Sequence, residues 1–182
     1  MNVVIMGASG FLGSHLCNFL KVKNTIIRCG RNKNNDVILK KINKKKFSKI
    51  LKKYVPDVVI NLIALTNVDL CEKKRKKAEE INSEIVKTIT QSINEIKLPK
   101  KIFFLQISTD QIYSGKGPHK ENSPKPINTY AKTKLKGEEY VKKIKGCVIR
   151  TNFVGKPFHN SKNGFTDWIF YSLNKGKNIP VF

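Results

Sequence analysis

A glycine-spaced turn near the N-terminus constrains this sequence more than any other feature. Residues 2–6 form a short apolar run, and apolar residues at helical spacing follow over residues 11–20. Between them the chain reads GASGFLG, with glycines at 7, 10 and 13. Glycine is needed where the backbone passes close to a diphosphate and where a helix packs tightly on its strand. The first N–H groups of the helix then face the anion. The pattern therefore predicts a strand, a turn and a helix that together bind a dinucleotide.

The rest of the chain alternates strand-like and helix-like patterns. Short apolar runs predict further strands at 25–29, 58–63, 102–107 and 147–150, with a sixth strand beginning at 178–182. Helical spacing predicts helices at 47–54, 75–96, 129–144 and 165–173. This alternation is typical of an α/β fold, a Rossmann-like doubly wound parallel sheet with helices on both faces. We expect residues 1–182 to form one NAD(P)-binding domain.

The large positive charge has two interpretations. Lys and Arg number 36 against 13 acidic residues, for a net charge of +23. However, 32 of the basic residues are Lys, and they fall in separate stretches such as 40–53 and 142–145. Proteins that read bases and phosphates favour the planar fork of Arg. A solvated lysine-rich surface is therefore favoured over nucleic-acid binding.

Other function classes are excluded by what the sequence lacks. It has no apolar run of the ~18 residues that a membrane span needs, and no secretory signal pattern at its start. Its four cysteines, at 17, 29, 71 and 147, form no CxxC pair, so neither a zinc site nor a disulfide framework is expected. The three histidines are isolated, and no metal site is predicted. A reducing cytoplasm is the simplest setting.

The residues after the second predicted strand bear on which dinucleotide binds. An acidic residue there would bind a ribose 2′-hydroxyl and favour NAD, whereas an arginine can hold a 2′-phosphate. Arg31 follows Gly30 at this point. The sequence therefore favours NADP(H) and leaves NAD(H) as the alternative. Asp36 and Val37 come next and are candidates for contact with the adenine side.

A tyrosine and a lysine stand four residues apart in the helix predicted at 129–144. Tyr130 and Lys134 would share one face of that helix, with Cβ atoms ~6 Å apart. A nearby ammonium favours the phenolate, so we expect Lys134 to lower the tyrosine pKa from its usual value near ~10. Thr109 follows the fourth predicted strand, at the edge where such sheets bind ligands. It could hydrogen-bond the oxygen that Tyr130 protonates.

Six ordered segments together carry a resemblance to a known family. They are GASGFLG, GR after the second strand, PDVVINLIALTNVDLCE, ISTDQIYSG, KENSPKPINTYAKTKLKGEEYV and VIRTNFVG. With them the chain resembles an extended short-chain dehydrogenase/reductase. More narrowly, it is similar to the dTDP-4-dehydrorhamnose reductase family over nearly its whole length.

The resemblance implies a set of site residues. The catalytic residues would be Thr109, Tyr130 and Lys134. The cofactor would be held by Gly7, Ser9, Gly10, Phe11, Leu12, Arg31, Asp36, Val37, Ala64, Leu65, Thr66, Tyr130 and Lys134. The sugar nucleotide would be approached by Val68, Thr109, Gln111 and Phe153.

Some residues depart from the family pattern. Ile63, Ala64 and Leu65 stand where the family usually has a small-residue pair and a tyrosine. Phe153 replaces a tryptophan beside the fifth strand. Gln111 stands where related 4,6-dehydratases have an acid, which disfavours dehydration. Family reductases also continue into a C-terminal substrate lobe, which is largely absent from these 182 residues.

The resemblance implies an activity and two alternatives. The activity is an NADP(H)-dependent reduction of a 4-keto sugar nucleotide, with hydride transfer to the ketone carbon, in the synthesis of a surface polysaccharide. The alternatives are a non-catalytic NADP-binding regulatory subunit and a sugar-nucleotide epimerase of the same superfamily. The expected partner is the nucleotide-sugar substrate, with neither nucleic acid nor membrane. The protein could also form a homodimer.

Overall fold

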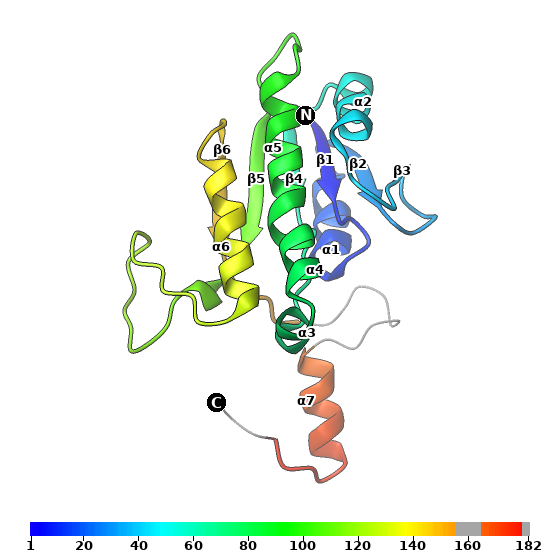
Figure 1. Ribbon diagram of the computed structural model, residues 1–182. Helices are drawn as coiled ribbons and strands as arrows, with labels where there is room; N and C mark the ends of the chain where they lie inside the picture. The colour runs from blue at the N-terminus through cyan, green and yellow to red at the C-terminus, as the bar shows by residue number, and fades with distance from the viewer. Residues whose placement is uncertain (156–164, 180–182) are drawn as a thin grey trace. The chain divides into compact units, whose positions relative to one another are not determined.

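A computed structural model describes residues 1–155 and 165–179 of the chain. Residues Met1–Thr151 form one compact unit, and the described part of Asn152–Phe182 belongs to a second unit. The first unit contains a six-stranded sheet in the order β3-β2-β1-β4-β5-β6, with every neighbouring pair parallel (Figure 1). Its strands are β1 Asn2–Met6, β2 Thr25–Gly30, β3 Val37–Ile38, β4 Val58–Asn61, β5 Phe103–Ser108 and β6 Gly146–Arg150.

Helices connect these strands. In the first unit they are α1 Phe11–Leu20, α2 Lys44–Tyr54, α3 Val68–Lys73, α4 Arg75–Glu79, a π-helical turn Glu80–Glu84, α5 Ile85–Glu95, a 3-10 turn Asp110–Ile112 and α6 Thr129–Val141. The second unit contains α7 Phe165–Asn174. The sequence predicted the alternation of strands and helices, and the parallel sheet confirms the doubly wound fold.

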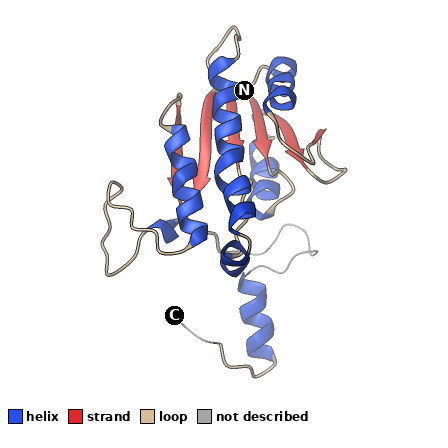
Figure 2. Ribbon diagram, viewed as in Figure 1, coloured by secondary structure: helices blue, strands red, loops and turns tan. Residues whose placement is uncertain are grey.

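The two faces of the sheet are covered by different helices, as Figure 2 shows. Because successive strand residues point to opposite faces, Val4 and Met6 pack with α2, α5 and α6, whereas Val3 and Ile5 pack with α1. The helices thus enclose the apolar residues of β1 on both sides. The strand order reverses between β1 and β4, and this is the switch point where such sheets bind ligands outside their carboxyl ends.

Several predicted boundaries were wrong. The helix expected at 75–96 is α4, a π-helical turn and α5, and the short α3 and β3 were not predicted. The strand expected at 58–63 ends at Asn61, because its ladder with β1 stops where that strand turns at Gly7. Residues 178–179 form no strand, and the rest of the strand expected at 178–182 lies outside the described residues.

Candidate functional site

The glycine turn lies where the ends of β1, β2 and β4 meet. The N–H groups of Gly7 and Ala8 both donate to the Cys29 carbonyl, at 2.8 and 3.2 Å. Gly7 has φ +82°, which L side chains rarely adopt, and a Cβ there would lie 3.2 Å from the carbonyl carbon of Leu62. A Cβ on Gly13 would lie 2.3 Å from the Gly7 carbonyl oxygen. Glycine is therefore required at both ends of the turn.

The start of α1 is suited to an anion. Its N-cap is Gly10, which offers no side-chain cap, and its first turn contains no acidic residue. The first N–H groups of a helix have no intrahelical acceptor and carry part of the positive end of the helix dipole. The amides of Phe11 and Leu12 are therefore available to a diphosphate. This cradle fits the dinucleotide that the sequence predicts.

The adenosine side of the predicted site is formed by β2 and the residues before β3. The Asp36 carboxylate accepts hydrogen bonds from the Arg28 N–H at 2.8 Å, from its Nε at 3.2 Å and from its Nη2 at 3.0 Å. Its hydrogen bonds with the Arg28 side chain hold the pKa of Asp36 below its usual value. Arg31 is exposed. Contacts of Arg31, Asp36 and Val37 with adenosine stay predictions.

The loop after β4 is fixed by a residue that the sequence analysis missed. Asn82, in the π-helical turn, accepts a hydrogen bond from the Leu65 N–H at 2.8 Å. Its Nδ2 donates to the Leu65 carbonyl and to Thr133 Oγ1, both at 3.1 Å. Asn82 lies four residues from both Ala78 and Val86, and all three are buried. A buried amide on an apolar helix face was the signal that could have revealed it.

The helix that carries the tyrosine and lysine is held at its start. Asn128 Oδ1 accepts a hydrogen bond from the Ala131 N–H at 2.8 Å and so caps α6. Glu72 of α3 accepts hydrogen bonds from the Thr129 N–H at 2.5 Å and from its hydroxyl at 2.8 Å. Two side chains, one from a distant element, therefore fix the turn that bears Tyr130.

The structure brings several of the predicted residues together beside Tyr130. The tyrosine is buried in a small cluster with Cys71, against which Leu65 and Val68 also pack. The Thr109 side chain interacts with the Tyr130 phenol. Tyr130 and Thr109 come from α6 and from the carboxyl end of β5, respectively. The site thus gathers residues from elements that are well separated in the sequence.

The expected lowering of the tyrosine pKa was wrong for this structure. Burial raises the pKa of Tyr130, and its interaction with the Thr109 side chain only partly opposes the rise. Lys134 Nζ donates to the Ile107 carbonyl oxygen at 2.6 Å. Burial lowers the pKa of Lys134 to about 8, with Glu138 acting in the opposite direction. Spacing along the helix predicted the shared face, but burial determines the ionisation.

A chain of buried amides leads to the carbonyl that Lys134 contacts. The Ile107 oxygen also accepts a hydrogen bond from Gln106 Nε2 at 2.7 Å. Gln106 Oε1 in turn accepts from Asn61 Nδ2 at 2.8 Å. Asn61 and Gln106 are both buried. The ends of β4 and β5 are therefore linked through their side chains to the candidate catalytic lysine.

The predicted substrate residues fall in different places. Thr109 Oγ1 accepts a hydrogen bond from the Gln111 N–H at 3.2 Å, and Gln111 itself is exposed. Val68 packs on the cluster around Tyr130. Phe153 belongs to the second unit, so its approach to the sugar nucleotide stays a prediction.

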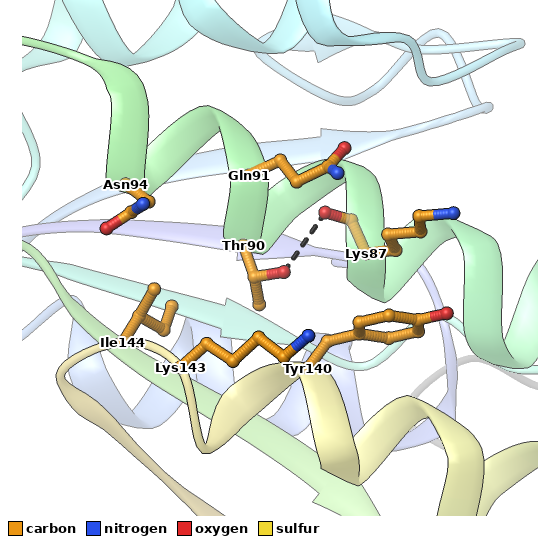
Figure 3. A pocket seen from close by; sticks show the side chains of 7 residues that line it. All are labelled: Lys87, Thr90, Gln91, Asn94, Tyr140, Lys143 and Ile144. Atoms are coloured by element: carbon orange, nitrogen blue, oxygen red, sulfur yellow. Dashed lines mark hydrogen bonds between the residues drawn. The ribbon is translucent and has the colours of Figure 1, made fainter.

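A pocket elsewhere in the fold is distinct from this site. It lies between α5 and α6, has a volume of about 140 Å³ and is lined by Lys87, Thr90, Gln91, Asn94, Tyr140, Lys143 and Ile144 (Figure 3). Lys87 and Lys143 each place an ammonium within 6 Å of the Tyr140 ring, at 5.9 and 5.8 Å. Tyr140 lies near the end of α6 that leads into β6, whereas Tyr130 is at the start of that helix.

Within residues 1–155 and 165–179, no three His, Cys, Asp or Glu side chains gather as a metal site would require. In the same part of the chain, no helix combines the length and the apolar character needed to cross a membrane.

The sheet order, the glycine turn and the tyrosine–lysine helix together define the dinucleotide-binding class of α/β proteins that includes the extended short-chain dehydrogenases/reductases. Comparison with known families is more specific. A family model described as the RmlD substrate binding domain matches residues 1–182, and the chain belongs to this family.

The curated relatives include both enzymes and a subunit. The chain is 31% identical over 157 residues to the spore coat polysaccharide biosynthesis protein SpsK of Bacillus subtilis, covering 84% of this chain and 53% of the relative. It is 30% identical to the dTDP-4-dehydrorhamnose reductase of Salmonella typhimurium, covering 85% and 52%. It is 27% identical to methionine adenosyltransferase 2 subunit beta of Danio rerio, covering 81% and 46%. The chain spans about half the length of these relatives.

Solved structures show the same fold. The dTDP-4-dehydrorhamnose reductase of Bacillus anthracis, in complex with NADP, is 26% identical with a TM-score of 0.80, covering 97% of this chain and 61% of that one. The UDP-glucuronic acid 4-epimerase of Bacillus cereus, in complex with UDP-glucuronic acid and NAD, is also 26% identical, with a TM-score of 0.70 and coverage of 82% and 56%.

Proposed function

We propose that this chain is the dinucleotide-binding part of an NADP(H)-dependent reductase that acts on a 4-keto sugar nucleotide. The observation that carries the proposal is the grouping of Thr109, Tyr130 and Lys134 at the carboxyl end of β5. The glycine turn follows β1, which is separated from β5 by β4 alone. The family membership and the reductase relatives support the same activity.

The chain's own residues would hold the cofactor and move the proton. The amides of Phe11 and Leu12 would bind the diphosphate, and Arg31 would pair with a 2′-phosphate. When bound, NADPH supplies the hydride that reduces the ketone carbon.

The raised pKa of Tyr130 suits reduction. A phenol that stays protonated at neutral pH can donate its proton to the ketone oxygen as charge develops there. The Thr109 hydroxyl would hydrogen-bond the same oxygen and orient it. Lys134, with its pKa lowered to about 8, would be mostly protonated at neutral pH and would stabilise negative charge near the phenol.

The test is NADPH oxidation by the purified protein with a 4-keto sugar nucleotide. Replacement Tyr130→Phe should lower kcat about 10²- to 10⁴-fold, the usual contribution of a general acid. Tyr140→Phe, ten residues along in the segment that carries the pocket, is the matched control and should retain turnover. Unchanged turnover in Tyr130→Phe would rule out the assigned role.

Two other functions have specific support and different outcomes in this assay. The epimerase neighbour, a complex with NAD, supports an epimerase, which would convert a sugar nucleotide without net oxidation of cofactor. The relative named as an adenosyltransferase subunit supports a regulatory protein, which would bind NADP and show no turnover. A homodimer, a cytoplasmic location and a role in polysaccharide synthesis are further parts of the proposal.

A further inference from the structure

An ion pair of a buried glutamate and a partly buried arginine lies next to the candidate catalytic residues. The Glu138 side chain is 3% exposed and that of Arg150 is 20% exposed. Arg150 Nε lies 3.2 and 3.1 Å from the two Glu138 oxygens, and its Nη2 lies 2.6 Å from Oε2. Glu138 Oε1 also accepts a hydrogen bond from the Ser108 hydroxyl at 2.5 Å. The pair thus links α6 to the ends of both β5 and β6.

The other side of Arg150 contacts the segment that follows the 3-10 turn. Its Nη1 donates to the Tyr113 hydroxyl oxygen and to the Glu121 carbonyl, both at 2.6 Å. The guanidinium carbon lies 5.3 Å from the centre of the Tyr113 ring, and His119 stacks on that ring with its centre at 5.2 Å. One side chain therefore fixes Tyr113 by its hydroxyl and by its ring.

Thr109 lies between two of these contacts, the one from Ser108 to Glu138 and the one from Arg150 to Tyr113. Ser108 precedes Thr109 directly, and Tyr113 follows the turn Asp110–Ile112. Within this stretch, the Gln111 N–H donates to Thr109 Oγ1 and the Tyr113 N–H donates to the Asp110 carbonyl at 3.0 Å. The ion pair consequently holds both ends of the short stretch that determines where the Thr109 hydroxyl lies.

A stabilising role alone does not account well for such a pair. Burying two charges carries a desolvation penalty that often matches or exceeds their attraction, so well-packed apolar residues can be at least as stable. What apolar residues cannot provide is a set of directed hydrogen bonds to Ser108 and Tyr113. The geometry therefore favours a role in positioning.

We propose that Glu138 and Arg150 are positioning residues that hold the Ser108–Tyr113 stretch at both ends and so direct the Thr109 hydroxyl toward the reacting ketone. This inference rests on the function proposed above for Thr109. If the proposal holds, loss of the Ser108–Glu138 contact or of the Tyr113–Arg150 contact reduces catalysis through Thr109. The same loss leaves cofactor binding at the glycine turn unchanged.

Two mild replacements test each contact without leaving a buried charge unpaired. Ser108→Ala removes the hydroxyl that donates to Glu138, and Tyr113→Phe removes the hydroxyl that accepts from Arg150. Each should lower kcat for the 4-keto sugar nucleotide about tenfold, within the range of coupling between contacting residues, with NADPH affinity unchanged. The matched controls are Ser92→Ala, a buried serine of α5, and Tyr140→Phe.

A double-mutant cycle separates positioning from a general structural effect. In a Thr109→Val background, Ser108→Ala and Tyr113→Phe should produce almost no further loss of kcat, because the group they position is absent. Losses of the same size in both backgrounds would overturn the proposal. A parallel weakening of NADPH binding would overturn it as well.

Amide hydrogen exchange gives a second measurement that needs no turnover. The Gln111 and Tyr113 amides should exchange about tenfold faster in Tyr113→Phe than in the unmodified protein, while the Ala131 amide at the start of α6 stays unchanged. Unchanged exchange at Gln111 would overturn the positioning role. If the two proteins show this difference in exchange but the unmodified protein shows no turnover, the proposed reductase activity is refuted instead, so the two failures can be told apart.

Discussion

The two halves of the proposed cofactor site are built in opposite ways. At the ends of β4 and β5, the polar side chains of Asn61, Asn82, Gln106 and Lys134 are all at most 4% exposed and are hydrogen-bonded to one another or to the backbone. At the edge formed by β2 and β3, the main polar contact is the pair of Arg28 and Asp36, with side chains 47% and 39% exposed.

This difference has a physical consequence. Hydrogen bonds inside a protein are strengthened by the low local dielectric, and breaking one leaves a partner buried and unsatisfied. An exposed ion pair is weakened by water and salt and contributes little. The half around Tyr130 is therefore fixed before any ligand binds, while the half around Arg31 can change with little effect on the fold. Four predictions test this contrast.

The largest effect is expected for Asn82→Ala. The replacement removes the hydrogen bonds to Leu65 and Thr133, leaves the Leu65 N–H without its side-chain acceptor, and leaves the Leu65 carbonyl only the weak Cys71 thiol donor; each unsatisfied group costs about 1–3 kcal/mol. We expect the free energy of unfolding to fall by about 3 kcal/mol in urea denaturation. Asn94→Ala, at an exposed position of α5, should change it by less than about 0.5 kcal/mol. Equal losses in the two variants would contradict the contrast.

The next effect concerns the pH dependence of stability. The pKa of Lys134 falls from 10.5 to about 8 on folding, so between these values the unfolded chain binds more protons than the folded one. Stability should therefore rise by about 2 kcal/mol between pH 7 and 9.5, mostly at the upper end of this range where the folded chain has lost the Lys134 proton. Lys134→Met removes this contribution. Unfolding measured at both pH values should show a smaller rise for the variant, and identical rises would disprove the burial effect.

On the exposed half, the expected effect is on cofactor preference. Arg31→Ala should weaken NADPH binding about tenfold, because one charge-assisted hydrogen bond to a 2′-phosphate is lost, and should leave NADH binding unchanged. Titration of the protein with each cofactor measures the two affinities. Lys33→Ala, an exposed lysine of the same loop, serves as the control. A comparable loss for both cofactors would show that Arg31 does not read the phosphate.

The smallest effect is expected for Asp36→Asn. The lowered pKa of Asp36 means that its pairing with Arg28 stabilises the fold at neutral pH and is lost as acid protonates the carboxylate. Because the pair is exposed, the replacement should reduce the free energy of unfolding by less than about 1 kcal/mol at pH 7. The difference should shrink as the pH falls through the lowered pKa of Asp36. A loss as large as that of Asn82→Ala would abolish the distinction between the two halves.

Much of the fold could be predicted because its signals are local. The apolar run at residues 2–6, the glycines that follow it and the spacing of Tyr130 and Lys134 each lie within one element or its turn. Elements of two to six residues, such as β3 and α3, supply too little periodicity to be recognised. The π-helical turn that presents Asn82 was also missed, because the apolar spacing around it resembles a continuous helix.

The sequence by itself determined the alternation of strands and helices, the glycine turn proposed to bind a diphosphate and the helix that carries the proposed proton donor. Tertiary structure alone decided which side chains hold that helix, such as Glu72 at its start, and in which direction the pKa of Tyr130 moves. The reason is that periodicity and turn chemistry act between neighbours in the chain, whereas burial and hydrogen bonding depend on elements that meet only when the sheet has formed.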